Sequence, residues 1–209
     1  MDVNLIRYTP DPDGLCGLAA AECYQGKNPE KSLDHAMDGG HLSITEHAAF
    51  TFRVTGVSRV LLAQLTRHRI ASFSVKSQRY CSVTPEWIVP PSIKQAGYER
   101  DYLEMCGICY ELMCEMIEHD VPAEDARYVI PQGVACSLIV TMNARELMHF
   151  FELRCCRRAQ WEIRNLANRM LEAARVISPA MFKNAGPACM RGPCPEGKKS
   201  CGHPIGGVW

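Results

Sequence analysis

A strict alternation of apolar and polar side chains in residues 48–55 constrains the fold most directly. Phe50, Phe52 and Val54 alternate there with threonine and arginine side chains. A period of two predicts a strand with one face buried. Residues 136–142 are β-branched and apolar enough to form a second, buried strand.

The rest of the ordered sequence is predicted to be mainly helical. Apolar residues recur at helical spacing in several segments, which glycine, proline and capping residues bound. These expected helices cover residues 13–25, 29–37, 57–67, 97–119, 122–127, 144–153 and 159–177. Residues 70–80 are rich in small side chains and are expected to form a loop. Few strands with helices before, between and after them predict an α+β fold, with a small, mostly antiparallel sheet flanked by helices.

The C-terminal segment differs in composition from the rest. Glycine, proline and cysteine dominate it without periodicity, so we expect one domain over residues 1–186 and an irregular Cys-rich tail over residues 187–209. Cys189, Cys194 and Cys201 could bind zinc there, with Cys155 or Cys156 as a fourth ligand. The spacing is not that of a standard zinc finger. An iron–sulfur cluster and free thiols in a flexible tail are the open alternatives.

Composition argues against several classes of protein. The 209 residues suffice for one well-buried domain, and the formal net charge of zero gives no general reason to expect nucleic acid or an acidic membrane as a partner. The N-terminal residues are charged and soon meet Pro10, so they do not resemble a signal peptide, and no apolar run approaches membrane-spanning length. We therefore expect a cytoplasmic protein whose 12 cysteines are mostly reduced.

Basic side chains concentrate in residues 67–80. Arg67, His68, Arg69, Lys76 and Arg79 are interleaved there with serines and apolar residues. Arginine forks and hydroxyl groups bind phosphate oxygens well. A solvated basic turn is the alternative that charge alone supports. The interleaving with apolar and hydroxyl residues favours a binding site.

Two further polar motifs precede predicted buried elements. His41, Ser43, Glu46 and His47 lie just before the first strand, where hydrogen-bonded histidines without a metal are the simpler interpretation. Arg127 stands just before a proline-ended segment, where a surface ion pair is the alternative.

The last motif begins at the end of the second strand. Asn143 is expected to cap the helix that follows, which carries Arg145, His149 and Arg154. The alternative is an amphipathic helix whose polar face meets solvent. The run Ala-Gln-Trp-Glu-Ile-Arg follows at residues 159–164.

In their order and spacing, these motifs resemble those of the flavin-dependent thymidylate synthases. The resemblance runs from residue 41 to residue 164 and implies the thymidylate synthase-complementing protein fold. It also implies a methyltransferase that converts dUMP to dTMP, with FAD as cofactor, 5,10-methylenetetrahydrofolate as carbon donor and NADPH as reductant. Members of this family are homotetramers whose active sites combine several subunits, so we expect a homotetramer.

The resemblance further implies which residues contact each ligand. Contacts to FAD are expected from His41, Ser43, Glu46, Arg67, His68, Arg69, Val75, Asn143, Ala144, Arg145 and His149. Contacts to dUMP are expected from Gln64, Leu65, Thr66, Arg67, Val75, Lys76, Ser77, Gln78, Arg79, Arg127 and Arg154. Arg154 is the expected catalytic residue, because a guanidinium can stabilise negative charge that develops on the uracil ring. Many members have an acidic or amide side chain where this chain has Val75, which can offer only its backbone.

Two other functions stay open at this point. A flavoenzyme that acts on a different uridine nucleotide would use much the same residues. A basic loop and a Cys-rich metal-binding tail would also suit a non-enzymatic RNA-binding protein, but neutral net charge and the lack of an aromatic platform argue against it.

Overall fold

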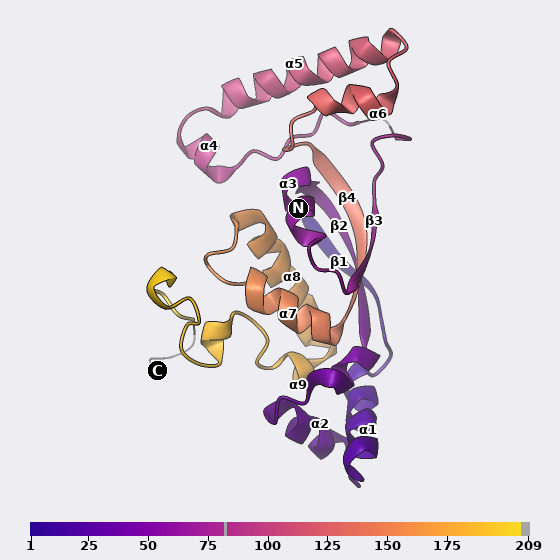
Figure 1. Cartoon of the computed structure of the whole chain (residues 1–209), viewed down its shortest axis with the longest axis vertical. Helices are drawn as coiled ribbons and strands as arrows, with labels where there is room; N and C mark the ends of the chain where they lie inside the picture. Colours follow the sequence, from indigo (N-terminus) through magenta and orange to yellow (C-terminus); the bar gives the residue numbers. More distant parts are fainter. Residues whose placement is uncertain (82, 206–209) are drawn as a thin grey trace. The chain divides into compact units, whose positions relative to one another are not determined.

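The computed structural model describes residues 1–81 and 83–205 and has an α+β architecture (Figure 1). Its strands β1 (Asp2–Tyr8), β2 (Ala49–Ser58), β3 (Ala71–Val75) and β4 (Ala135–Asn143) form one small antiparallel sheet in the order β1-β2-β4-β3. The predicted fold class is therefore confirmed. No helix in the described part of the chain is both long and apolar enough to cross a membrane.

Helices separate and follow the strands. They are α1 (Pro12–Tyr24), α2 (Pro29–Asp38), α3 (Arg59–Leu65), α4 (Pro91–Gln95), α5 (Glu99–Glu118), α6 (Ala123–Ala126), α7 (Ala144–Arg154), α8 (Trp161–Ile177) and α9 (Pro179–Phe182). Short 3₁₀ turns lie at η1 (Leu42–His47), η2 (Arg127–Val129), η3 (Ala188–Met190) and η4 (Gly197–Lys199).

The described chain divides into two compact units, each assembled from segments that are distant in sequence. The first unit contains Met1–Asp2, Val54–Thr66 and Ser74–Leu138. The second contains Val3–Arg53, Arg67–Phe73 and the described residues from Ile139 onward. The predicted boundary between residues 186 and 187 stays a prediction.

An aromatic cluster forms the core of the second unit. Phe50 of β2, Phe151 of α7 and Phe182 of α9 are fully buried. The Phe182 ring lies edge-on to both partners, with ring centroids 5.4 Å from Phe50 and 5.9 Å from Phe151. Such edge-to-face pairs add about 0.5–1.5 kcal/mol beyond the area that they bury. The cluster thereby fixes α7, which carries several of the predicted site residues, against β2.

The helix predicted to begin at Asp13 begins earlier and is capped by another residue. Asp11 adopts a left-handed backbone conformation with φ of 43° and caps α1 with its side chain. Asp13 lies within the first turn, and its carboxylate accepts hydrogen bonds from the Ser178 hydroxyl and from the amides of Ala180 and Met181. The helix was predicted to start one residue too late, because an acidic residue in the first turn gives nearly the same sequence signal as a capping residue. Its actual role is to join α1 to the start of α9.

The predicted loop at residues 70–80 contains strand β3. Ala71, Phe73 and Val75 are half-buried, whereas Ser72 and Ser74 are exposed. This alternation has the period of a strand, but serine and alanine have low strand propensity and concealed it. Val75 is therefore the last residue of a strand, with its side chain half-buried.

The first unit is mostly the helical excursion between β3 and β4. Helix α5 packs against α6 and α4 (Figure 1). It was predicted at residues 97–119 and is observed at Glu99–Glu118, with Cys106 and Met113 buried. Tyr102 Oη donates to the Ile88 carbonyl at 3.3 Å and anchors the N-terminal half of α5.

Candidate active site

His68 is the centre of a buried hydrogen-bonded cluster in the second unit. It lies in the turn between α3 and β3, and only 4% of its surface is exposed. Its Nδ1 is 2.8 Å from Oε1 of Glu146, and Arg154 Nε donates to its Nε2 at 3.1 Å. The Phe150 ring lies edge-on to the imidazole, with centroids 5.0 Å apart. The imidazole thus lies along α7, held at both ends by residues of that helix.

The partners of His68 determine its protonation state. Arginine has no acceptor, so Nε2 of His68 must accept the bond from Arg154 and carries no proton. The single proton of the neutral ring is then on Nδ1, which donates to Glu146. Burial lowers the pKa of His68 most strongly; the hydrogen bond and negative charge of Glu146 oppose this, and Arg154 and His149 lower the pKa further. The neutral imidazole is therefore the stable form at neutral pH.

Arg154 occupies a partly dry environment. Burial lowers the pKa of its guanidinium, and the positive charge of Arg67 acts in the same direction. Guanidinium keeps its charge even in such surroundings, because its ordinary pKa is far above neutral. The structure thus brings Arg67, His68 and Arg154 together from two segments that are distant in sequence.

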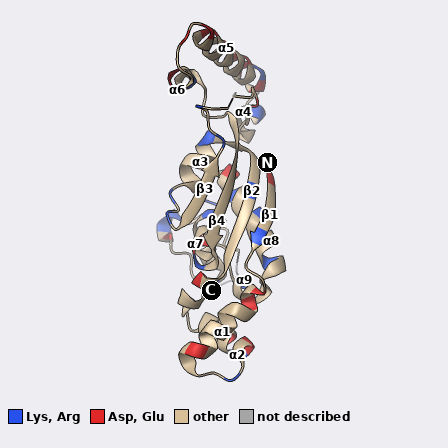
Figure 2. Cartoon of the chain, turned by 90° about the vertical axis from the view of Figure 1, so that its right-hand side faces the viewer, with Lys and Arg blue, Asp and Glu red and all other residues tan. Residues whose placement is uncertain are grey.

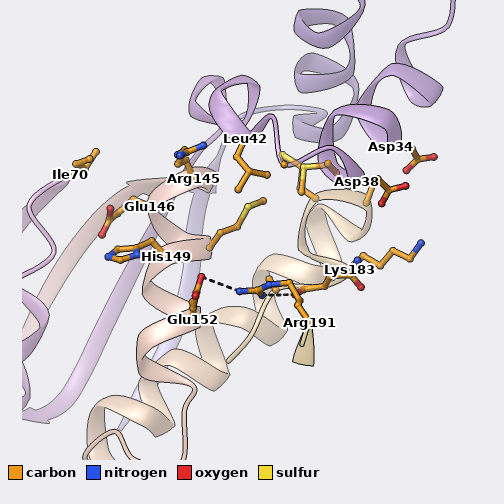
Figure 3. A pocket seen from close by; sticks show the side chains of 17 residues that line it. Asp34, Asp38, Leu42, Ile70, Arg145, Glu146, His149, Glu152, Lys183 and Arg191 are labelled. Atoms are coloured by element: carbon orange, nitrogen blue, oxygen red, sulfur yellow. Dashed lines mark hydrogen bonds and ion pairs between the residues drawn. The ribbon is translucent and has the colours of Figure 1, made fainter. Parts of the chain in front are cut away.

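A cavity of about 610 Å³ adjoins this cluster in the second unit. Arg145, Glu146 and His149 of α7 line one part of it, and Asp34 and Asp38 of α2 line another (Figure 3). Figure 2 shows acidic residues, in red, in the region of α1 and α2. The apolar part of the lining comes from Met37, Leu42, Ile70, Met148, Ala180, Met181 and Ala185.

Two ion pairs border the cavity. Arg145 Nε lies 3.8 Å from Oε1 of Glu46, and both side chains are about half exposed. Arg191 of the C-terminal segment lies 3.0 Å from Oε2 of Glu152 and also donates to the carbonyls of Asn184 and Gly186. Figure 3 shows the Arg191–Glu152 contact at the wall opposite Leu42. Residues predicted for FAD thus share this cavity with residues that the sequence did not suggest.

The remaining residues predicted for FAD vary in exposure. His41, Ser43, Arg67 and Arg69 are exposed, and the His41 ring packs on Tyr24 with centroids 5.8 Å apart. Asn143 caps α7 as predicted, and its Oδ1 accepts from the Glu146 amide at 2.9 Å. Ala144 is fully buried, so a ligand could reach only its backbone.

Residues predicted for dUMP cluster in the first unit around Glu124. Nη2 of Arg79 lies 2.6 Å from Oε2 of Glu124, and Nε of Arg127 donates to the backbone carbonyl of Glu124 at 3.0 Å. The Ser77 hydroxyl accepts from the Arg79 amide at 3.1 Å. One residue that the sequence analysis missed therefore connects the two arginines. The sequence did indicate a contact between Glu124 and Arg127, because residues three apart in the helical turn after Pro122 are neighbours.

The other residues predicted for dUMP in this unit have local partners. Thr66 Oγ1 donates to the Leu62 carbonyl at 3.0 Å, and Lys76 Nζ donates to Thr84 Oγ1 at 3.4 Å. Thr66 and Gln78 line a cavity of about 370 Å³. Gln64 Nε2 donates to the Val60 carbonyl at 3.5 Å. Leu65 is fully buried, which leaves only its backbone for a ligand.

Metal coordination finds little support in the described residues. Within residues 1–81 and 83–205, one group of histidine, cysteine and acidic side chains has ligand atoms within 4.8 Å of one another, namely His68, Glu146 and His149. Both nitrogens of His68 are already hydrogen-bonded, and the positive charge of Arg154 beside them would repel a metal cation. The geometry therefore suits a hydrogen-bond network better than a metal.

The cysteines predicted for zinc do not form such a group in the described chain. Cys155 and Cys189 are buried, and burial raises the pKa of the Cys155 thiol to about 12. The Cys189 sulfur accepts from the Ile205 amide at 3.5 Å, and Cys156, Cys194 and Cys201 are half-buried. Zinc in the tail stays a prediction, which metal analysis of the purified protein can test.

Comparison with known proteins identifies the family. The model of the family described as thymidylate synthase complementing protein matches residues 4–180. A flavin-dependent thymidylate synthase of Geobacter sulfurreducens is 44% identical over 218 residues, covering 97% of this chain and 94% of that protein. One of Clostridium tetani is 41% identical over 230 residues, covering 96% and 92%.

A solved structure agrees in fold. PolB from Streptomyces cacaoi, described as a UMP/dUMP methylase bound with 5-Br dUMP, superimposes with a TM-score of 0.78. The match covers 87% of this chain and 93% of PolB at 23% sequence identity. With relatives above 40% identity along nearly its whole length, the chain belongs to the family of flavin-dependent thymidylate synthases.

Proposed function

We propose that this protein catalyses the reductive methylation of dUMP to dTMP, with FAD as its cofactor. In this proposal 5,10-methylenetetrahydrofolate donates the carbon and NADPH is the reductant. The observation that carries it is the bond from Arg154 Nε to His68 Nε2, since the two residues are 86 positions apart and belong to two of the motifs expected at the site. The names of the relatives and the description of PolB support the same reaction class.

FAD fits the residues of the cavity in the second unit. Its volume of about 610 Å³ lies within the range of roughly 300–1,000 Å³ typical of cofactor pockets. A mostly apolar lining suits a flat aromatic ring, and Arg145 offers a cation for a phosphate group. His149 lines the same space and has His68 beside it, and Glu46 is paired with Arg145. Bound FAD would supply the electrons for reduction of the transferred carbon.

Arg154 is the proposed catalytic residue. Its guanidinium would stabilise negative charge at N3 and the adjacent carbonyl groups of uracil, which makes C5 more nucleophilic. Partial burial strengthens this effect because the local dielectric is lower than that of water. His68 contributes by holding Nε of the guanidinium through its unprotonated Nε2.

Positioning of the nucleotide is assigned to residues of the basic motifs. Arg79 and Arg127, with the Ser77 hydroxyl, form a compact cationic group in the first unit that suits a phosphate. Arg67 of the second unit is exposed and is proposed to contact both FAD and dUMP. Correct alignment of the reacting rings contributes a large part of the rate in reactions between two bound molecules.

Assembly into a homotetramer is part of the proposal. Helix α5 presents Met105, Ile108 and Leu112 to solvent at helical spacing, and all three are at least 42% exposed. An apolar stripe of this kind is characteristic of a surface that another chain covers. Light scattering of the purified protein, with Ile108→Glu as the variant expected to dissociate the assembly, tests this.

The experiment for the catalytic proposal is tritium release. The purified protein should show flavin absorbance and should release tritium from C5-labelled dUMP when NADPH and methylenetetrahydrofolate are present. Arg154→Ala should lose about 100- to 1,000-fold in turnover, as expected for removal of one charge-stabilising donor, and should keep its flavin absorbance. Arg169→Ala, which removes an exposed arginine of α8, is the matched control.

Two outcomes would contradict parts of this proposal. Flavin absorbance without tritium release would leave a flavoenzyme that acts on another uridine nucleotide. Unchanged turnover in Arg154→Ala would remove the role assigned to Arg154.

A further inference from the structure

Glu146 is a buried carboxylate to which none of the sequence motifs assigned a role. It lies in the first turn of α7, and only 6% of its surface is exposed. Burial of a carboxylate is costly unless strong hydrogen bonds compensate it. Its Oε1 finds such a bond at Nδ1 of His68, which is 78 positions away in the sequence.

The position of Glu146 in α7 makes this contact informative. It is the third helical residue after the cap Asn143, where a glutamate commonly reaches back to the amide of the cap residue. Here Oε1 is instead bonded to a side chain from another segment. Helix capping alone therefore does not account for a glutamate at this position.

The directions of the hydrogen bonds connect Glu146 to Arg154. Arg154 Nε–H can only donate, so His68 Nε2 accepts, and His68 Nδ1–H donates to Glu146. In the other neutral tautomer the proton would be on Nε2. The N–H groups of His68 and Arg154 would then point at each other, and neither could accept a hydrogen bond. A carboxylate at Nδ1 favours the tautomer that Arg154 requires.

We propose that Glu146 is a positioning residue, which holds His68 in the Nδ1–H tautomer so that Nε2 fixes the plane of the Arg154 guanidinium. The bond at Nε restrains rotation of this planar group about its last side-chain torsions. The terminal amino groups of Arg154 are then held in one orientation before a nucleotide binds. This inference rests on the proposed function for the step that Arg154 performs, but its hydrogen-bond chain can be measured without catalysis.

Three variants separate positioning from structural support. Glu146→Gln keeps an acceptor for Nδ1–H at nearly the same volume, whereas Glu146→Leu removes the acceptor. Glu162→Gln removes a different buried carboxylate of the same unit, on α8, and controls for general loss of stability. Nitrogen-15 NMR of the imidazole reports the tautomer of His68 in each protein.

The tautomer and the kinetic constants should change together. The unsubstituted enzyme, Glu146→Gln and Glu162→Gln should show the Nδ1–H tautomer of His68. Glu146→Leu should lose this preference and about 100-fold in kcat, as expected for misplacement of a catalytic group, with flavin absorbance retained and a smaller change in KM for dUMP. Glu146→Gln should recover most of that turnover.

The inference and the proposed function fail in different ways. An Nδ1–H tautomer that persists in Glu146→Leu, or a Glu146→Gln enzyme as slow as Glu146→Leu, would overturn the positioning role. Absence of tritium release from the unsubstituted enzyme would instead refute the proposed function, whatever tautomer His68 adopts.

Discussion

Glu124 connects the two arginines that we expect to bind the phosphate of dUMP, and its replacement by glutamine tests that expectation. In the ligand-free chain its carboxylate is 2.6 Å from Arg79, and its carbonyl accepts from Arg127. A phosphate that binds Arg79 must displace this carboxylate or accommodate its negative charge. We therefore expect Glu124→Gln to bind dUMP more tightly than the unsubstituted protein.

The exposure of the pair sets the size of the effect. The side chains of Arg79 and Glu124 are 49% and 48% exposed, and ion pairs at that exposure contribute about 0–1 kcal/mol. Repulsion between a carboxylate and a phosphate about 4 Å apart in water adds about 1 kcal/mol. The two contributions together come to about 1–2 kcal/mol. Since about 1.4 kcal/mol corresponds to a factor of ten in affinity, Kd should fall by about five- to thirtyfold.

Isothermal titration calorimetry with dUMP provides the measurement. Deoxyuridine, which lacks the phosphate, should bind both proteins equally, because the substitution acts through the charge of the phosphate. Glu111→Gln, at an exposed position of α5, removes the same charge elsewhere in the first unit and should leave Kd unchanged. The difference between Glu124→Gln and the unsubstituted protein should shrink as salt screens the charges.

Weaker or unchanged binding of dUMP by Glu124→Gln would refute this reasoning. The same is true of equal gains for dUMP and deoxyuridine, since the effect would then not involve the phosphate. In either case Arg79 and Arg127 would lose their assignment to the phosphate.

Two further predictions concern stability. Asp13→Ala removes the acceptor of three hydrogen bonds at the start of α9 and should lower the free energy of unfolding by about 2–4 kcal/mol. Denaturant titration measures this change, and a loss below about 0.5 kcal/mol would contradict the anchoring role of Asp13. His68 faces Glu146, His149 and Arg154, and its pKa is lowered in the folded protein. As the pH falls through and below about 6.5, the unfolded state therefore binds more protons than the folded state. Stability should therefore decrease with acidification in that range, and His68→Gln should show a smaller decrease; equal pH dependence in both proteins would count against a buried neutral imidazole.

Most of the predicted elements followed from local periodicity in the sequence. Strands β2 and β4 and the long helix α5 were predicted within a few residues, because each shows a clear period of its own. Strand β1 was missed because its seven residues lie at the edge of the sheet and are mostly exposed, so charged and polar side chains interrupt the apolar pattern. Elements whose burial depends on a distant partner give a weak local signal.

The site divides in a similar way. Family motifs suggested His68 and Arg154, but their direct contact depends on how the turn before β3 meets α7, which no local pattern encodes. Glu146 and Glu124 resemble ordinary helix-surface glutamates in the sequence. Only the folded chain shows that one faces a buried imidazole and the other connects two arginines.

The contact between Asp13 and the start of α9 has a consequence for synthesis of the chain. Asp13 and Ser178 are 165 positions apart, so the second unit cannot close until nearly the whole chain has left the ribosome. The helices between β3 and β4 make contacts that are local in sequence, and these can form earlier. Helix α1 is synthesised first but cannot make its contacts with α9 until α9 has been synthesised. During that interval the surface of α1 that α9 covers is available to chaperones.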